Sequence, residues 1–259
     1  MTDESQKTGS KEIALFDALI NCEIAGYEEA PALVLLHGNG EDLHVFDPHI
    51  RYFSQYFRTI AIDTRGHGKS TRGEVPLTFH TFASDLTDVF EALQIDKAHI
   101  VGFSDGAITA LHLALKCPDL ISSMVLIGAN YNPKGLRWFP RMQIFFVYAC
   151  LSIASLFSEK IRKRKEIWSL MVGQPNLTLE QLSRITTPAL IVTGENDVVS
   201  QSHNDEIHRA IAGSQRLIIH RGNHFWMFRQ PEKLNQCVMD FLNTVSIKRR
   251  DRDSNPGYP

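Results

Sequence analysis

Short apolar segments alternate with longer amphipathic ones along most of this chain. Continuous apolar runs of this kind indicate strands of a parallel sheet that helices cover on both faces. Between them, apolar residues recur at helical spacing in residues 79–93 and in residues 234–242, after a Pro231 that is well placed to open a helix. The alternation predicts an α/β fold with a doubly wound, mostly parallel sheet, and residues 12–25 are expected to add one or two antiparallel edge strands. The predicted buried strands are residues 32–36, 59–62, 98–101, 124–127, 189–192 and 216–219.

The alternation breaks once, between residues 131 and 187, where helical patterns occur without a clear strand. We interpret residues 131–187 as a helical cap inserted into a core made of residues 1–130 and 188–247. The tail, residues 248–259, has no apolar periodicity and is predicted to be disordered. The aromatic residues of the predicted cap include Trp138, Phe139, Phe145, Phe146, Tyr148, Phe157 and Trp168.

One part of the predicted cap is unusually apolar. Residues 144–157 form an apolar run of 14 residues, and the basic residues 162–165 follow it. A helix that spans a bilayer needs about 20 apolar residues, so the run is too short for that. A buried or pocket-lining helix is the favoured interpretation, and attachment to a membrane interface is the alternative.

The segment Gly102-Phe103-Ser104-Asp105-Gly106 lies between a predicted strand and a helical pattern at residues 107–115. In a strand–turn–helix context, a serine between two glycines has a strained backbone and an exposed hydroxyl at the sheet edge. The glycines avoid clashes where helix and strand approach each other. The motif predicts that Ser104 is a nucleophile.

A serine hydroxyl reacts poorly until a base takes its proton and a third group orients that base. The prediction for Ser104 therefore requires a carboxylate and a histidine elsewhere at the carboxyl ends of strands, where open α/β sheets build their sites. The loop after the strand at residues 189–192 offers Glu195 and Asp197, and the segment after the next strand offers His220 and His224. Residue types alone leave both pairs open.

Four motifs together resemble those of α/β-hydrolases of the capped esterase, lipase and lactonase type. They are the turn around Ser104, the His-Gly-Asn-Gly loop at residues 37–40, the Asp-Thr-Arg-Gly-His-Gly-Lys-Ser segment at residues 63–70, and the acid and histidine loops. The resemblance implies the chain order serine, acid, histidine. It places the acid at Asp197 and the base at His224, because Glu195 comes earlier in its turn and His220 still belongs to the strand end. The 63–70 segment, with Arg65 and His67, is interpreted as structural.

Attack on a carbonyl group creates an oxyanion, which requires preorganised hydrogen-bond donors. The expected donors are the backbone N–H groups of Asn39 and Asp105. The side-chain amide of Asn39 is either a further donor or a turn former.

Asp105 has two possible roles beyond its backbone. The sequence around it resembles that of amino-acid ester hydrolases, which implies that its carboxylate recognises a cationic group of the substrate. The favoured interpretation is that a negative side chain at the start of a helix complements the helix dipole.

The predicted function is that of a serine hydrolase that cleaves a carboxylic ester, thioester or lactone through an acyl-enzyme, without metal or organic cofactor. An aromatic cap, with Phe225 and Trp226 beside the base, predicts a small-molecule substrate with an apolar part. The alternatives are hydrolysis of aminoacyl esters or of carbon–carbon bonds by the same residues, and a non-catalytic ligand-binding scaffold.

Composition excludes some partners. A net charge of −2 gives no sign of a basic surface for nucleic acid, and the eleven histidines show no metal-ligand spacing.

Four scattered cysteines without a C-x-x-C pair are interpreted as small buried residues in a reducing compartment. The polar N-terminus, residues 1–10, lacks the apolar run that a secretory signal needs, so we expect a cytoplasmic protein. Membrane association is the disfavoured interpretation. The oligomeric state stays open.

Overall fold

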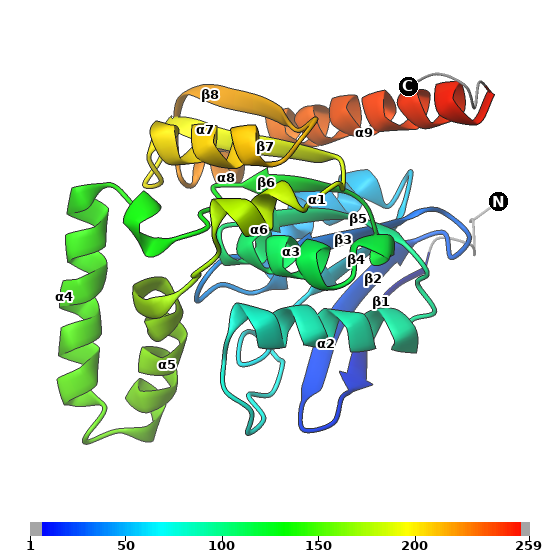
Figure 1. The fold of residues 1–259 in the computed structure, drawn as a ribbon. Helices are drawn as coiled ribbons and strands as arrows, with labels where there is room; N and C mark the ends of the chain where they lie inside the picture. The colour runs from blue at the N-terminus through cyan, green and yellow to red at the C-terminus, as the bar shows by residue number, and fades with distance from the viewer. Residues whose placement is uncertain (1–6, 255–259) are drawn as a thin grey trace.

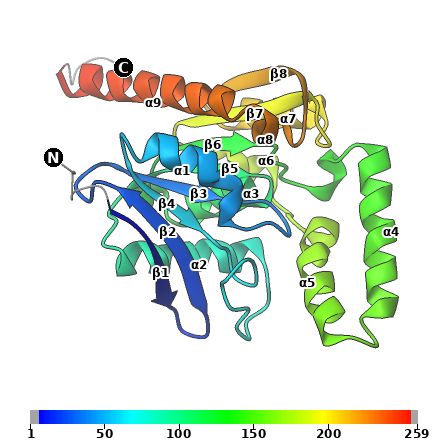
Figure 2. The same cartoon turned by 180° about the vertical axis from the view of Figure 1, so that it is seen from behind.

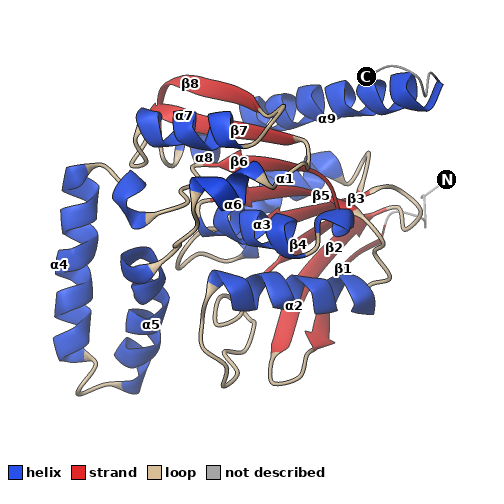
Figure 3. Ribbon diagram, in the orientation of Figure 1, coloured by secondary structure: helices blue, strands red, loops and turns tan. Residues whose placement is uncertain are grey.

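The computed structural model describes residues 7–254, which form an eight-stranded sheet with helices on both faces (Figures 1 and 3). The strand order is β1-β2-β4-β3-β5-β6-β7-β8; β1 and β2 pair antiparallel, β2 pairs antiparallel with β4, and the remaining pairs are parallel. The predicted α/β class is confirmed. The strands are β1 (Lys7–Ala14), β2 (Leu19–Gly26), β3 (Ala32–Leu36), β4 (Arg58–Ile62), β5 (Ala98–Phe103), β6 (Ile121–Ile127), β7 (Ala189–Asn196) and β8 (Gln215–Asn223).

Most of the helices lie between successive strands, and in residues 7–254 three short 3-10 turns lie in connections between a strand and a helix. The α-helices are α1 (Asp47–Phe53), α2 (Phe79–Ala92), α3 (Asp105–Lys116), α4 (Trp138–Ala154), α5 (Glu159–Gly173), α6 (Leu179–Ser183), α7 (Gln201–Ala210), α8 (Trp226–Arg229) and α9 (Pro231–Ser254). The 3-10 turns are η1 (Leu43–Phe46), η2 (Pro118–Leu120) and η3 (Pro133–Gly135).

Each predicted strand lies within an observed one, and the core explains why their apolar runs are continuous. In β5, Ile100 packs with residues of α2 and α3 on one face, whereas Val101 and Phe103 pack with α1 and α9 on the other. Figures 1 and 2 show these helices on opposite sides of the sheet. The expectation of burial on both faces is wrong for β8, where Ile218 is 46% exposed. Within the described part of the chain, this strand ends the sheet and pairs only with β7.

A helical insertion that contains α4, α5 and α6 lies between β6 and β7. Its helices differ in what they contact. Helices α4 and α5 pair with each other and project beyond one end of the sheet, whereas α6 packs into the core through the buried Leu182 (Figure 1). An ion pair between Arg72 and Glu166, and a 2.9 Å hydrogen bond from Asn39 Nδ2 to Ile167 O, tie α5 to the core. Helix α5 is therefore the inner helix of the projecting pair.

Helix α4 contains no buried residue, so the apolar run within it does not form a core helix.

The exposed residues of α4 include Cys150. Of the four free cysteines only Cys22 is fully buried, so the expectation that all four are buried is wrong. Within residues 7–254, no helix combines the length and apolar character needed to cross a bilayer.

Helix α9 extends further than the sequence indicated. It continues to Ser254, so residues 248–254 are helical and the predicted start of a disordered tail at residue 248 is wrong. The sequence contains neither proline nor glycine between Pro231 and Pro256, so no strong helix breaker stands in the way. Residues 255–259 of the predicted tail lie outside the described residues.

Candidate active site

Ser104 occupies a strained turn between β5 and α3. Its φ of 52° lies in the left-handed region that non-glycine residues rarely adopt. A Cβ atom at Gly102 would lie 2.5 Å from the backbone of Gly106, and one at Gly106 would lie 2.1 Å from Leu36 O. The Ser104 N–H group donates to Ile127 O at 2.8 Å. Both glycines are therefore required for the turn that presents the serine.

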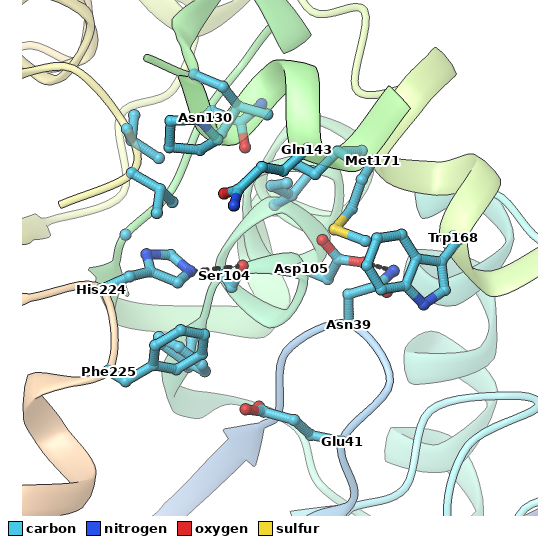
Figure 4. A pocket seen from close by; sticks show the side chains of 18 of the residues that line it. Asn39, Glu41, Ser104, Asp105, Asn130, Gln143, Trp168, Met171, His224 and Phe225 are labelled. Atoms are coloured by element: carbon cyan, nitrogen blue, oxygen red, sulfur yellow. Dashed lines mark hydrogen bonds between the residues drawn. The ribbon is translucent and has the colours of Figure 1, made fainter. Parts of the chain in front are cut away.

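Three residues far apart in the sequence form one line of hydrogen bonds at the carboxyl end of the sheet, and Figure 4 shows the part between Ser104 and His224. Ser104 Oγ lies 3.2 Å from His224 Nε2, and His224 Nδ1 lies 2.7 Å from Asp197 Oδ1. The histidine is 7% exposed and the aspartate 1%. The structure thus brings together the predicted nucleophile, base and acid.

The surroundings of Asp197 keep its carboxylate charged. Burial by itself raises its pKa, but the hydrogen bond and charge of His224, with backbone N–H groups of Val199 and Gly194, hold the pKa below its usual value. An ionised Asp197 only accepts hydrogen bonds, so Nδ1 of His224 carries a proton. In the neutral imidazole, Nε2 is then the acceptor that faces the Ser104 hydroxyl.

The two alternative residues form a separate pair at the protein surface. Glu195 Oε2 lies 3.0 Å from His220 Nδ1 and accepts from Arg221 N–H at 2.8 Å. Both Glu195 and His220 are exposed. The structure does not bring either of them to Ser104.

The loop after β3 and the start of α3 place Asn39 and Asp105 beside Ser104 in one pocket. Their backbone N–H groups have no hydrogen-bond acceptor among residues 7–254. Beneath the loop, buried His37 accepts from Thr64 N–H at 3.0 Å through Nε2, so its Nδ1–H donates to Gly38 O at 2.8 Å. Burial lowers the pKa of His37, and the neutral ring holds this loop in place.

The side-chain amide of Asn39 is already occupied. It donates to Asp105 Oδ2 at 2.8 Å (Figure 4) and to Ile167 O at 2.9 Å, so it links the loop to α3 and α5. Of the two open roles, this geometry favours a structural one. Burial raises the pKa of Asp105 to about 6, against the opposing effects of Asn39 and His224.

The 63–70 segment lies outside the pocket, in agreement with its structural interpretation. Asp63 accepts from the backbone N–H groups of Leu43 at 2.8 Å and Lys69 at 2.9 Å. Arg65, 3% exposed, donates to Asp85 at 2.7 Å and 2.8 Å.

The pocket around Ser104 has a volume of about 280 Å³. Helices α4 and α5 supply much of its apolar wall, and a few polar side chains interrupt it. The apolar wall includes Ile144, Val147, Trp168 and Met171, and the polar groups include Glu41, Asn130 and Gln143 (Figure 4).

Sequence reasoning missed two residues of this site. Gly128 has a φ of +62°, and a Cβ atom there would lie 2.7 Å from His224 Cε1, so only glycine leaves room for the ring. A glycine directly after the predicted strand 124–127 was the available signal. Glu41 lines the pocket and accepts from Gly38 N–H at 3.0 Å, and burial raises its pKa to about 7. No local motif marked Glu41, because its burial depends on the folded pocket.

The raised pKa of Glu41 should make the stability of the fold depend on pH. Its pKa in the folded chain, about 7, exceeds the ordinary value of 4.5, so the folded state binds this proton more tightly than the unfolded chain. The free energy of unfolding therefore falls as pH rises from 4.5 to about 7, because the folded state loses this more tightly bound proton. We expect E41Q to match the wild type near the lower pH and to exceed it by about 1–2 kcal/mol above the higher one.

Urea unfolding across this pH range measures the effect. E29Q, which removes one carboxyl group from an exposed loop, is the matched control. Parallel pH curves for E41Q and the wild type would contradict the assignment.

Among the described residues, one group brings three possible metal-ligating atoms within 4.8 Å of one another, namely Glu23, His44 and Asp47. Two of the three are exposed, and none lines the pocket of Ser104. Exposed acidic groups of this kind carry no metal assignment.

A family model described as the alpha/beta hydrolase fold matches residues 31–153. The serine hydrolase BPHL of Mus musculus is 30% identical over 238 residues, which cover 82% of this chain and 79% of that protein. The chain belongs to the α/β-hydrolase fold superfamily.

Two further similar proteins agree with this membership. The uncharacterized carboxylesterase nap of Bacillus subtilis is 28% identical over 250 residues, covering 85% of this chain and 81% of that protein. The crystal structure of a hydrolase from Pseudomonas aeruginosa PA01 superposes with a TM-score of 0.75, at 24% identity, over 90% of this chain and 98% of that one. At this identity the structural likeness shows the fold alone.

Proposed function

We propose that this α/β-hydrolase cleaves carboxylic esters, or related thioesters or lactones, through an acyl-enzyme on Ser104. The observation that carries the proposal is the continuous line from Ser104 Oγ through His224 to Asp197, at 3.2 Å and 2.7 Å. Scaffolds that only bind ligands have no need of such an activated base. Carboxylesterases and lactonases among the relatives support the same reaction class.

The reaction follows from the protonation states. His224 Nε2 takes the proton of Ser104 as Oγ attacks the carbonyl carbon, and Asp197 stabilises the imidazolium that forms. The backbone N–H groups of Asn39 and Asp105 stabilise the oxyanion. His224 then protonates the leaving alcohol, and a water molecule activated by His224 releases the acid.

Residues 131–187 act as a cap in this proposal, over a core of residues 1–130 and 188–247. Its helices α4 and α5 supply apolar pocket walls around the attacked bond. Such walls favour a substrate with an apolar acyl or alcohol group.

A second candidate, aminoacyl-ester hydrolysis, is favoured by the position of Asp105. Its carboxyl group lines the pocket beside Ser104, and with a pKa of about 6 it is mostly ionised at pH 7 and above. A negative group there attracts the α-amino group of an aminoacyl ester. The alternative is that Asp105 only serves the start of α3 and fixes Asn39.

A panel of p-nitrophenyl esters with increasing acyl length, together with a matched pair of phenylalanine and 3-phenylpropanoate esters, tests both candidates. We expect ester turnover with an optimum set by the apolar pocket. Loss of turnover for every ester would contradict ester hydrolysis and favour carbon–carbon or amide bonds. Equal kcat/KM for the matched pair would exclude recognition by Asp105.

A further inference from the structure

The outer face of α4 carries a continuous apolar stripe. Phe139, Met142, Phe146, Ala149 and Ile153 follow one another at alternating spacings of three and four residues, which places them along one side of a helix. Four of them are 50–71% exposed as large apolar side chains, and Ala149 is also exposed. Single exposed apolar residues are ordinary, but a contiguous stripe of this size indicates an interaction surface.

The stripe lies on the far side of the helix from the pocket. Pro140, Ile144 and Val147 of α4 line the pocket, and α5 lies between α4 and the core (Figures 1 and 2). The apolar surface continues past the end of the helix, where Leu156 is 78% exposed and Phe157 is 85% exposed.

Basic residues flank the stripe at both ends. Residues 131–187 contain nine Lys or Arg and three Glu, a net charge of +6, although the whole chain has a net charge of −2. Arg137 and Arg141 stand at the start of α4, and exposed Lys160, Lys163 and Arg164 follow the α4–α5 turn. The segment that carries the exposed apolar surface thus has an excess of positive charge.

This charge pattern distinguishes between possible occupants. Two copies could pair through their stripes with the α4 helices parallel, which would bring the two basic α4–α5 turns together. With the helices antiparallel, the basic α4–α5 turn of each copy would meet the basic start of α4 in the other copy. Either places like charges opposite each other, which is unfavourable. An anionic lipid surface complements the basic ends and accepts the apolar side chains at the same time.

We propose that the outer face of α4, with its basic flanks, binds the surface of an anionic lipid bilayer. The aromatic side chains enter the headgroup region while Lys and Arg contact lipid phosphates and carboxylates. The helix lies in the plane of the interface and does not cross the bilayer. This surface is independent of the proposed ester hydrolysis, so either can fail without the other.

Co-sedimentation of the full chain with vesicles tests the proposal. We expect binding to vesicles of phosphatidylcholine mixed with phosphatidylserine, weaker binding to phosphatidylcholine alone, and loss of binding at high salt. The double variant F146S/I153S should lower the partition coefficient about tenfold or more, because it removes two apolar side chains from the stripe. The control F16S replaces a phenylalanine that is 98% exposed in the β1–β2 turn, and it should bind like the wild type.

A second pair of variants separates local charge from net charge. K160Q/K163Q removes two charges beside the stripe and should lower binding about tenfold or more, whereas K97Q/K233Q removes two exposed charges elsewhere and should change it little. Circular dichroism of each variant verifies folding.

Three results would overturn the proposal. One is a wild-type chain that binds neither vesicle, or both equally and independently of salt. Another is equal loss of binding in the two lysine pairs. The third is a dimer in sedimentation velocity that F146S/I153S dissociates in the absence of lipid, which would assign the stripe to a second copy.

Discussion

S104A is expected to lower kcat by about 10⁵–10⁶ for any ester that the chain hydrolyses, with little change in KM. The alanine variant lacks the oxygen that forms the acyl-enzyme, while the pocket and the backbone N–H donors stay in place. The turn itself depends on Gly102 and Gly106, so the fold should tolerate the loss of the hydroxyl. Steady-state kinetics over the ester panel measures the change.

The matched control for this change is S202A, which removes a serine hydroxyl from the exposed side of α7. Its kinetics should equal those of the wild type. If S104A kept wild-type turnover, Ser104 could not be the nucleophile.

D197N is expected to lower kcat by about 10⁴, while E195Q leaves kcat almost unchanged. Asparagine fits the same buried space, but its amide donates to Nδ1 of His224 and shifts the proton to Nε2. A protonated Nε2 cannot take the proton of Ser104. Glu195 is paired with His220 at the surface and should not affect this step.

The two variants together test which acid orients the base. Glu195 lies at the end of β7 and Asp197 directly follows this strand, and each variant removes one carboxylate, so their effects on net charge are identical. A large loss of kcat in E195Q with normal activity in D197N would show that Glu195 orients the base, and would contradict the assignment of Asp197. Equal and small losses of kcat in both variants would show that neither carboxylate is needed to orient the base.

The buried strands could be predicted because burial on both faces leaves a direct mark in the sequence. Continuous apolar runs gave the positions of β3 to β7, since each of these strands has a partner on either side and helices on both faces. The same rule overstated the burial of β8, because its place at the edge follows from strand order, which no local pattern encodes. The extent of α9 was underestimated for a related reason: low apolar periodicity does not end a helix that lacks a breaker.

In the candidate site too, some residues are marked by a local sequence pattern and others are placed only by tertiary packing. Ser104 was found because the turn needs glycines at fixed positions, and the loops after later strands offered few acids and histidines to choose from. The contacts of Asn39 with Asp105 and Ile167, the space that Gly128 leaves for His224, and the burial of Glu41 each depend on segments distant in the sequence. Such contacts come from tertiary packing, which residue patterns do not report.

The exposure of the apolar run in residues 144–157 also depends on the folded structure. Hydrophobicity alone favoured a buried or pocket-lining helix, because it does not reveal how many sides of a helix are covered. In the structure one side of α4 lines the pocket and the opposite side is exposed. That division is what makes an interfacial role testable.

The central claim is that His224 and Asp197 make the Ser104 hydroxyl reactive near neutral pH. The most direct measurement is intact-protein and peptide mass spectrometry after incubation with a fluorophosphonate probe, which reacts with activated serines. Our account predicts one adduct per chain, located on Ser104, and no adduct in S104A or on a chain whose His224 is replaced by glutamine. An unlabelled wild type, or a label on another serine that persists in S104A, would contradict it.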